Sequence, residues 1–403
     1  MTGNENSAES IVGGTFASGV VGGAQVSNDN MKLDGKMVVT YNNVSTTSSN
    51  NIKGNCTSDD VYNNDASFES TGNSDAWVAQ VDDVKYADLQ EAIKAAAPVG
   101  IVKLLSDVAM TESITISDEL TIDLNGHTLA GTDSATSSFG LINIQPGADL
   151  TITDSSKNGS GAITLVATND RDWNAYSSVI SNQRGKLTVN GGTIQHLGGT
   201  DMAYGIDNLT NGEGTYAETI VNSGTVKSTY RAIRQFLNGT EAQNILTVNG
   251  GTIDGINKSI WMQDPSTSAN SGTLTVSDEA TLIGDVYLFV TSGSTEWPVS
   301  VSIADAALYG ESKVVPANVP EGIEVKEVGG YWGISYENTS YVAAVRGVSY
   351  TTLQDAINDA EPGDTILILD NVTLAAGLNV DNGDKIIIDL NGKTVSYETT
   401  ENK

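Results

Sequence analysis

The sequence is poor in the residues that build most catalytic and metal sites. It has one cysteine, Cys56, so it can form no disulfide within the chain. Its two histidines, His127 and His196, leave little material for a histidine metal site or a Ser–His–Asp triad. Both histidines lie in or beside turn segments, where turn or surface roles are expected. The sequence has no segment of about 18 apolar residues, so we expect no membrane-spanning helix.

Positive charge is also scarce. The 403 residues include 20 Lys and Arg against 50 Asp and Glu, which gives a formal net charge of −30. This balance disfavours nucleic acids and anionic membrane surfaces as partners and suits the acidic surface of a dispersed, secreted protein. Calcium bound at Asp-rich turns, as between Asp381 and Asp384, is an alternative explanation of the charge. No dense run of alternating aspartates supports it, so we expect no cofactor.

One phrase, Leu-Thr-Val-Asn-Gly-Gly-Thr-Ile, organises the chain. It occupies 187–194 and returns at 246–253, and looser copies lie near 150, 220 and 274. When the copies are aligned on one apolar position, successive copies are 27 to 37 residues apart. The aligned positions are Ile122, Ile152, Val189, Val221, Val248, Val276 and Ile303. Recurrence at such intervals indicates a repeat architecture.

Each copy has the pattern of a strand, a tight turn and a second strand. Apolar side chains alternate along the strands, and Asn-Gly-Gly supplies the positive φ that a sharp bend needs. No helical pattern long enough for a crossover helix lies between copies, which argues against a βαβ fold. The sequence therefore predicts an all-β protein, a parallel β-helix, and the family resemblance described below implies that it is right-handed. A β-propeller is the alternative, although its blades are longer, about 40–50 residues.

The pattern divides the chain into four segments. Residues 1–75 are polar and rich in Gly, Asn, Ser and Thr, which predicts irregular β structure or partial disorder. Residues 76–315 are expected to form the β-helix, with a capping helix near 88–97. Residues 316–340 read as a closing hairpin and linker. Residues 341–403 match the start of the β-helix segment and are expected to form an incomplete second module, the least stable folded part of the chain.

The expected capping helix has its own signals. Asp88, with Glu91 three residues later, is a plausible N-cap pair, and Pro98 ends the helix. In the second copy Thr352 and Asp355 take the places of the cap pair. The apolar positions of the first helix recur at helical spacing and are Leu89, Ala92, Ile93 and Ala96.

These motifs resemble those of a known family. The Leu-Gln-x-Ala-Ile helix core, the Pro-Gly-Asp-Thr-Ile of 362–366 and the Asp-Leu-Asn-Gly-x-Thr beginning at Asp123 and Asp389 are similar to the start of pectate-lyase-like right-handed parallel β-helices in secreted and surface-exposed bacterial proteins. The resemblance implies a helix over the first coil and an extracellular or cell-surface location. Residues 1–6 have neither a basic region nor an apolar core, so we expect no export signal within this chain.

A second strand precedes the phrase in several copies. Its isoleucines are expected to form a core ladder, namely Ile180, Ile206, Ile233 and Ile260. The residues that follow them would form an outward column of Ser181, Asp207, Arg234 and Trp261. The next residues, Asn182, Asn208 and Gln235, are candidates for an amide ladder.

The outward column supplies the candidate site. An aromatic ring beside carboxylate, guanidinium and amide groups suits a saccharide-binding groove. The candidate ligand-binding residues are Tyr204, Asp207, Arg234, Trp261, Gln263 and Asp264. The alternative is a solvated surface on which Asp207 and Arg234 form an ordinary ion pair.

Three functions remain open from the sequence. The first is adhesion or glycan recognition, with a polysaccharide or glycoprotein glycan as partner. The second is a polysaccharide lyase or glycoside hydrolase, for which Asp207, Arg231 and Arg234 are the best catalytic candidates, although no pair of aspartates lies on these strands. The third is a structural spacer without a ligand. The fold hosts catalysts and binding proteins alike, so it does not decide among them.

Overall fold

The chain forms two compact units, Met1–Val108 and Ala109–Lys403. The computed structural model describes residues 77–397 except 171–174, 200, 213–214, 265–269, 291–298, 320–321, 337–339 and 381–384, together with short strands before residue 63. Cys56, Asp381 and Asp384 lie outside the described residues.

Within its described residues, the first unit contains short strands and one helix. Its early strands pair in parallel, β1 with β2, β2 with β4 and β3 with β5. Their bounds are Ser10–Phe16, Gln25–Leu33, Met37–Val38, Ile52–Lys53 and Val61–Tyr62 for β1 to β5. Later in the unit, β6 (Ala79–Val81) pairs antiparallel with both β7 (Val84–Tyr86) and β8 (Val99–Leu104). Strand β9 (Val108–Met110) spans the boundary between the two units. The boundary therefore comes after residue 76, where the sequence predicts the β-helix to begin.

The expected helix is present as α2, Leu89–Ala96. The Asp88 carboxylate accepts a hydrogen bond from the Glu91 amide at 2.9 Å, which confirms the predicted N-cap. Leu89, Ala92 and Ala96 are buried, and Ile93 is half-buried, so the predicted apolar face is the packed one. Within the described residues the second helix is α3, Leu353–Asp359, and neither helix has the length and apolar character that a membrane span requires.

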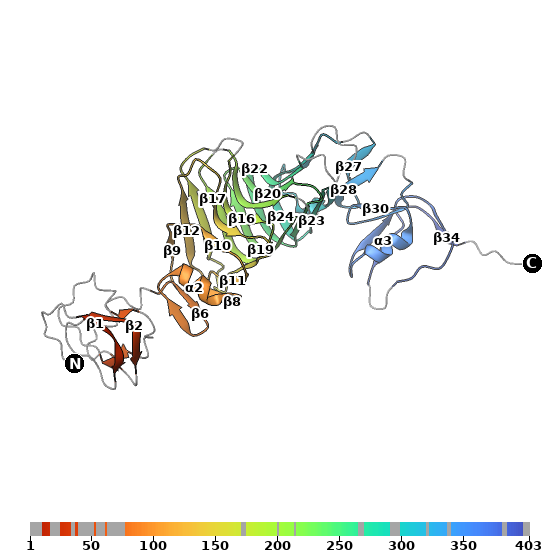
Figure 1. Ribbon diagram of the computed structural model, residues 1–403. Helices are drawn as coiled ribbons and strands as arrows, with labels where there is room; N and C mark the ends of the chain where they lie inside the picture. The colour runs from red at the N-terminus through yellow and green to blue at the C-terminus, as the bar shows by residue number, and fades with distance from the viewer. Residues whose placement is uncertain are drawn as a thin grey trace, which may run out of the picture. The chain divides into compact units, whose positions relative to one another are not determined.

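The second unit is a long stack of mostly parallel strands (Figure 1). Three ladders run along it, and each repeat adds one rung to each ladder. The first ladder comprises β10 (Ile114–Ile116), β13 (Phe139–Ile144), β16 (Ser177–Gln183), β18 (Ala203–Asn211), β20 (Arg231–Asn238), the second halves of β22 (Gly251–Asp264) and β24 (Ala280–Val290), and β26 (Val314–Ala317).

The other two ladders share their long strands. The second ladder comprises β11 (Glu119–Asp123), β14 (Asp149–Thr153), the first halves of β17 (Lys186–Leu197) and β19 (Tyr216–Ser228), then β21 (Gln243–Val248), β23 (Ser271–Val276) and β25 (Val299–Ala304). The third ladder comprises β12 (Thr128–Asp133), β15 (Ala162–Ala167) and the remaining halves of β17, β19, β22 and β24.

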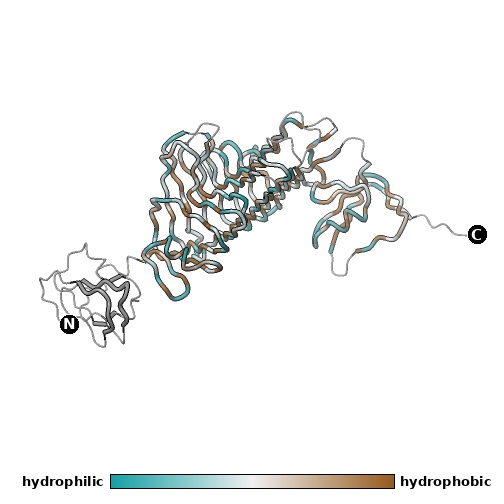
Figure 2. The backbone as a smooth tube through the Cα atoms, in the orientation of Figure 1, coloured by the Kyte–Doolittle hydropathy of each residue, from teal (hydrophilic) through white to brown (hydrophobic). Residues whose placement is uncertain are grey.

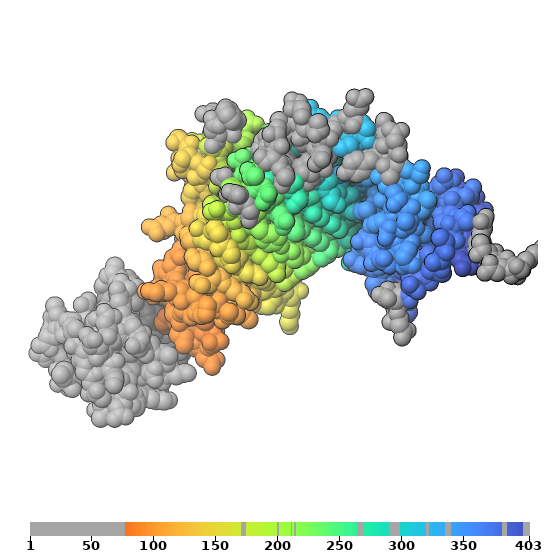
Figure 3. Space-filling model, turned by 45° about the vertical axis from the view of Figure 1, so that its right-hand side comes forward, coloured from red at the N-terminus to blue at the C-terminus, as the bar shows by residue number. Residues whose placement is uncertain are grey.

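The register follows the repeat phrase. The chain Ile122–Ile152–Val189–Val221–Val248–Val276–Ile303 is paired rung by rung, as the sequence alignment predicted. The isoleucine ladder Ile180–Ile206–Ile233–Ile260 is likewise in register and fully buried. Hydrophobic and hydrophilic residues alternate along these strands (Figure 2), and the repeats appear as successive bands in the space-filling view (Figure 3). The core is therefore a continuous apolar stack.

Glycines at the turns between the second and third ladders stack on one another. Gly192, Gly224 and Gly251 have φ values of +77°, +91° and +82°. A Cβ on Gly251 would lie 2.5 Å from the Gly224 carbonyl oxygen, and a Cβ on Gly224 would lie 2.6 Å from that of Gly192. Both the backbone conformation and the close approach of the next repeat therefore require glycine here.

The parallel stack ends in an antiparallel hairpin. Strand β28 (Tyr331–Tyr336) pairs antiparallel with β25 and with β27 (Ile323–Val328), after the short 3-10 helix η2 (Asp305–Ala307). Beyond it, the Ser302 hydroxyl donates to the Arg346 carbonyl. The segment after 341 thus contacts the end of the stack.

That segment also has a small core of its own. It contains β29 (Ala343–Val345), β30 (Val348–Tyr350), β31 (Thr365–Ile368), β32 (Val372–Leu374), β33 (Ile387–Asp389) and β34 (Val395–Tyr397). One face of α3 packs on this core through Leu353, Ala356 and Ile357. The Thr352 hydroxyl caps α3 by accepting from the Asp355 amide at 3.1 Å.

Replacing one rung of the isoleucine ladder tests the stack. We expect Ile206→Ala to lower the free energy of unfolding by about 2–5 kcal/mol, because the side chain is fully buried between two rungs. Ile256→Ala is the matched control, since Ile256 is 77% exposed, and it should change stability by less than about 0.5 kcal/mol. Urea unfolding followed by circular dichroism measures both. Equal effects would contradict a continuous core.

Candidate functional site

The predicted column exists and runs along the first ladder. Ser181 pairs with Asp207, Asp207 with Arg234, and Arg234 with Trp261, and Tyr287 continues the series. Each member follows a buried isoleucine or valine of the core ladder. Because successive side chains on a strand point to opposite faces, the column projects away from the apolar core.

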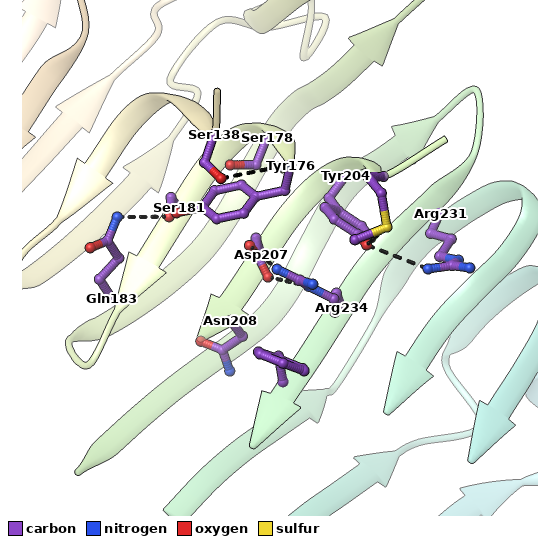
Figure 4. A network of polar contacts seen from close by, with 12 residues as sticks. Ser138, Tyr176, Ser178, Ser181, Gln183, Tyr204, Asp207, Asn208, Arg231 and Arg234 are labelled. Carbon is purple, nitrogen blue, oxygen red and sulfur yellow. Dashed lines mark hydrogen bonds and ion pairs between the residues drawn. The ribbon is translucent and has the colours of Figure 1, made fainter. Parts of the chain in front are cut away.

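Asp207 and Arg234 form a bidentate ion pair (Figure 4). Arg234 Nε donates to Asp207 Oδ1 and Arg234 Nη2 to Asp207 Oδ2, both at 2.7 Å. The Arg234 side chain is 5% exposed and the Asp207 side chain is 0% exposed. This corrects the expectation of a solvated surface pair. The guanidinium carbon lies 4.5 Å from the ring centroid of Tyr204, 4.7 Å from that of Phe236 and 5.5 Å from that of Tyr176.

The two opposite charges of the Asp207–Arg234 pair stabilise each other. Burial by itself would lower the pKa of the Arg234 guanidinium, but the charge and hydrogen bonds of Asp207 outweigh it, and the pKa is raised. Burial raises the pKa of Tyr204 to about 12, so this phenol stays neutral beside the pair. A bidentate pair enclosed by rings is rigid, and both carboxylate oxygens of Asp207 are occupied.

Arg231 connects the pair to Trp261. Its guanidinium lies over the ring of Trp261 and, at 4.3 Å, over that of Tyr230. It donates to the Tyr230 hydroxyl at 2.7 Å and to the Tyr204 hydroxyl at 3.4 Å. Burial lowers the pKa of Arg231 to about 10, which still leaves it charged at neutral pH. Among the described residues, Arg231 Nε and Trp261 Nε1 have no hydrogen-bond partner.

The predicted ligand set therefore divides into two groups. Tyr204, Asp207 and Arg234 are buried, whereas Trp261 and Gln263 are half-exposed. The Asp264 backbone pairs with Val290, and its side chain lies outside the described residues. The structure brings Tyr204, Asp207 and Arg234 together as a support and leaves Trp261 and Gln263 nearer the surface.

Sequence reasoning missed the aromatic residues around the column. Phe236 pairs with Gln263, and Gln263 pairs with Phe289 one strand further on. Phe236, Phe289 and Tyr287 are half-exposed and occupy outward positions of three neighbouring strands together with Trp261. The strand alternation that identified Arg234 would also have found Phe236, since it lies two residues later on the same face.

The predicted series of hydrogen-bonded amides is present, but its third member is Asn244 and not Gln235. Asn182 Nδ2 donates to Asn208 Oδ1 at 2.7 Å, and Asn208 Nδ2 donates to Asn244 Oδ1 at 2.7 Å. Gln235 instead donates to the Thr273 carbonyl at 3.1 Å. The amide series thus passes from the first ladder of strands to the second, because the Asn208 side chain points inward and Asn244 is also buried there.

His196 is another correction, because it is fully buried rather than at a turn or on the surface. Its Nε2 lies 2.9 Å from the Ser177 hydroxyl, and that hydroxyl donates to Asp133 at 2.5 Å. Serine lies between the other two residues, so the order differs from a catalytic triad, in which histidine is central. Within the part of the chain that the structure describes, no three His, Cys, Asp or Glu residues are grouped closely enough to hold a metal ion.

Breaking the ion pair should be costly. We expect Asp207→Asn and Arg234→Met each to lower the free energy of unfolding by about 3–5 kcal/mol, because each leaves a buried polar partner uncompensated. The double variant Asp207→Leu/Arg234→Met should recover much of that loss. Lys186→Met is the control, since its 3.4 Å bridge to Asp149 is exposed, and should cost less than about 1 kcal/mol. Single-variant losses no larger than the control would show that the pair is not structural.

Comparison of the chain with protein-family models, with curated proteins and with solved structures gives no significant match. The interpretation of the site therefore depends on its geometry and on the internal repeat.

Proposed function

We propose that this chain is a right-handed parallel β-helix of the pectate-lyase-like, secreted or cell-surface bacterial type, and that it recognises a glycan. The in-register parallel ladders support the fold assignment, since each repeat returns the chain to the same three strand positions. The net charge of −30 supports an extracellular, dispersed protein. The proposed binding surface is the outer face of the first ladder around Trp261.

One observation carries the binding proposal. Aromatic residues make up 6% of the chain, yet Phe236, Trp261, Tyr287 and Phe289 gather at outward positions of neighbouring strands and remain half-buried rather than fully buried. Neighbouring strands lie about 4.8 Å apart, so these four side chains, called here the platform, lie within reach of one another. Flat aromatic surfaces with polar groups at their margin suit the apolar faces and hydroxyl edges of sugars.

Polar groups lie beside this platform. Gln263 stands between Phe236 and Phe289 in the strand register. Lys258 Nζ lies 5.3 Å from the Tyr287 ring centroid and 4.0 Å from Asp285 Oδ2. Beside the platform, one strand from Trp261 in the same outward column, Arg234 of the ion pair contacts the rings of Tyr204 and Phe236. In this proposal Asp207 and Arg234 are positioning residues that do not touch the ligand.

The geometry favours binding over hydrolysis. A glycosidase needs two carboxylates that flank the scissile bond, with one free to act as acid and the other as base or nucleophile. Both oxygens of Asp207 accept from Arg234, and the pair is buried, so Asp207 is poorly placed for either role. A polysaccharide lyase or glycosidase remains the alternative that turnover would reveal.

The test is a screen of acidic and neutral glycans with and without calcium, followed by titration of any hit. Trp261→Ala should weaken binding at least tenfold, because it removes the central ring of the platform. Tyr309→Ala is the matched control, since Tyr309 is a 64% exposed aromatic residue outside this face, and it should bind as the parent does. No binding to any glycan would favour a structural spacer. Turnover that depends on Asp207 would favour the enzyme.

A further inference from the structure

The first turn of the second module, the segment after 341, lies against the end of the stack. Arg346 and Gly347 form this turn between β29 and β30, with φ values of +49° and +74°. The Ser302 hydroxyl of β25 donates to the Arg346 carbonyl. Gly333 of β28 pairs with Ser302, and the three nearest neighbours of a Cβ placed on Gly333 would all be atoms of Gly347. The backbone of the turn therefore approaches the backbone of β28 where no side chain separates them.

Two further contacts extend this surface. A Cβ placed on Gly347 would lie 2.9 Å from the Tyr331 Cβ. Leu367 of β31 lies against the turn of the terminal hairpin, since a Cβ placed on Gly329 would lie 3.3 Å from the Leu367 Cδ2. Because β28 is paired with β25, the hairpin is part of the stack. The surface that receives the turn, called here the end surface, comprises Ser302, Gly329, Tyr331 and Gly333.

The Arg346 side chain holds the turn from within the second module. Its guanidinium lies 2.7 Å from Glu361 Oε1, 3.3 Å from Asp359 Oδ2 and 3.5 Å from Asp364 Oδ2. Burial alone would lower the pKa of Arg346, but these three carboxylates outweigh it and raise the pKa. Arginine is uncommon at the positive φ of a two-residue hairpin turn, so the three contacts compensate for an unfavourable conformation.

The first module lacks this set of residues. The two modules align at an offset of 264 residues through their helices. At this offset the counterparts of Arg346, Gly347 and Leu367 are two acids and a lysine, namely Asp82, Asp83 and Lys103. The counterparts of the three acids that contact Arg346 are uncharged, namely Ala95, Ala97 and Gly100. The arginine, its carboxylates, the glycine and the leucine thus occur together in the module whose turn meets the end surface.

Arg346 also offsets repulsion between like charges. Burial raises the pKa of Tyr331, and the charges of Asp278, on the stack, and Asp364, in the second module, raise it further, whereas Arg346 acts in the opposite direction. Two carboxylates near one phenol repel each other, and the chain has a net charge of −30. A guanidinium beside the same phenol therefore favours the contact.

We propose that the Arg346–Gly347 turn is a docking element that fixes the folded second module on the end surface. The glycines of the end surface admit a turn whose backbone comes close, and the guanidinium neutralises the acids that this approach brings to the stack. A turn of two aspartates, as in the first module, would place a side chain against Tyr331 and add negative charge. The partner that the end surface fits is therefore an Arg-Gly turn of the same repeat.

The distance between two spin labels in the full chain tests the docking. The labels are attached at Glu279→Cys on the stack and Thr394→Cys in the second module, both exposed positions, with Cys56→Ser to remove the native thiol. We expect one narrow distance distribution by double electron–electron resonance. A parent chain with a broad distribution would overturn the proposal, because the second module would then be joined to the stack by the chain alone.

A pair of glycine variants isolates the close approach. Gly333→Val should broaden the distribution at least twofold, because the new side chain meets Gly347, whereas valine suits the extended backbone of β28. Gly377→Val is the matched control, since a Cβ there meets nothing within 4 Å, and it should leave the distribution narrow. Slow amide exchange in β29 to β31 should persist in both variants. A distribution for Gly333→Val as narrow as that of the control, or loss of this protection, would contradict docking of a folded module.

Arg346→Asn tests the neutralisation separately. Asparagine adopts the positive φ of the turn readily but cannot reach the three carboxylates. We expect a broader distribution at low salt that narrows at about 1 M salt, where the repulsion is screened. Gly333→Val should stay broad at both salt concentrations, since its effect is steric. An Arg346→Asn distribution as narrow as that of the parent at low salt would show that the guanidinium does not contribute to docking.

Discussion

Parallel hydrogen bonding between equivalent residues of successive repeats is the constraint on which the rest of the structure depends. Shifting a strand by one residue would turn every inward side chain outward, so register and burial cannot be chosen separately. The Ile122–Ile303 series and the Ile180–Ile260 series satisfy both at each rung. The glycine turns keep this spacing because Gly224 and Gly251 approach the preceding turn too closely for any side chain.

The same register aligns polar groups on both faces of the first ladder. On the inner face, Asn182, Asn208 and Asn244 satisfy one another inside the stack. On the outer face, Asp207 meets Arg234 one rung on, and their buried charges are balanced by a bidentate contact. Burying an unpaired amide or charge would be costly, so each partner stabilises the fold only while the register holds. The ion pair beside the aromatic platform is thus a product of the repeat.

Much of the architecture could be predicted from the sequence, because each copy of the repeat phrase contains the alternating apolar pattern of a strand and the glycines of a turn. The rungs of the second ladder, the isoleucine core and the Asp88 cap of α2 were predictable from local pattern. The enclosure of Asp207 and Arg234 was not predictable, because Tyr176 lies just before β16, two strands from Arg234, and alternation alone does not say what covers an outward residue. Asn244 was missed because it lies on a strand of the second ladder, whereas Asn182 and Asn208 lie on strands of the first.

Methyl–methyl contacts in solution test the register most directly. In a perdeuterated sample with labelled Ile, Leu and Val methyl groups, we expect nuclear Overhauser cross-peaks between Val189 and Val221 and between Val221 and Val248, which are paired rungs. Val189 and Val248 lie two rungs apart, roughly 10 Å, and should give a much weaker peak or none. A direct Val189–Val248 contact as strong as the adjacent pairs, or the absence of the adjacent contacts, would contradict the ladder.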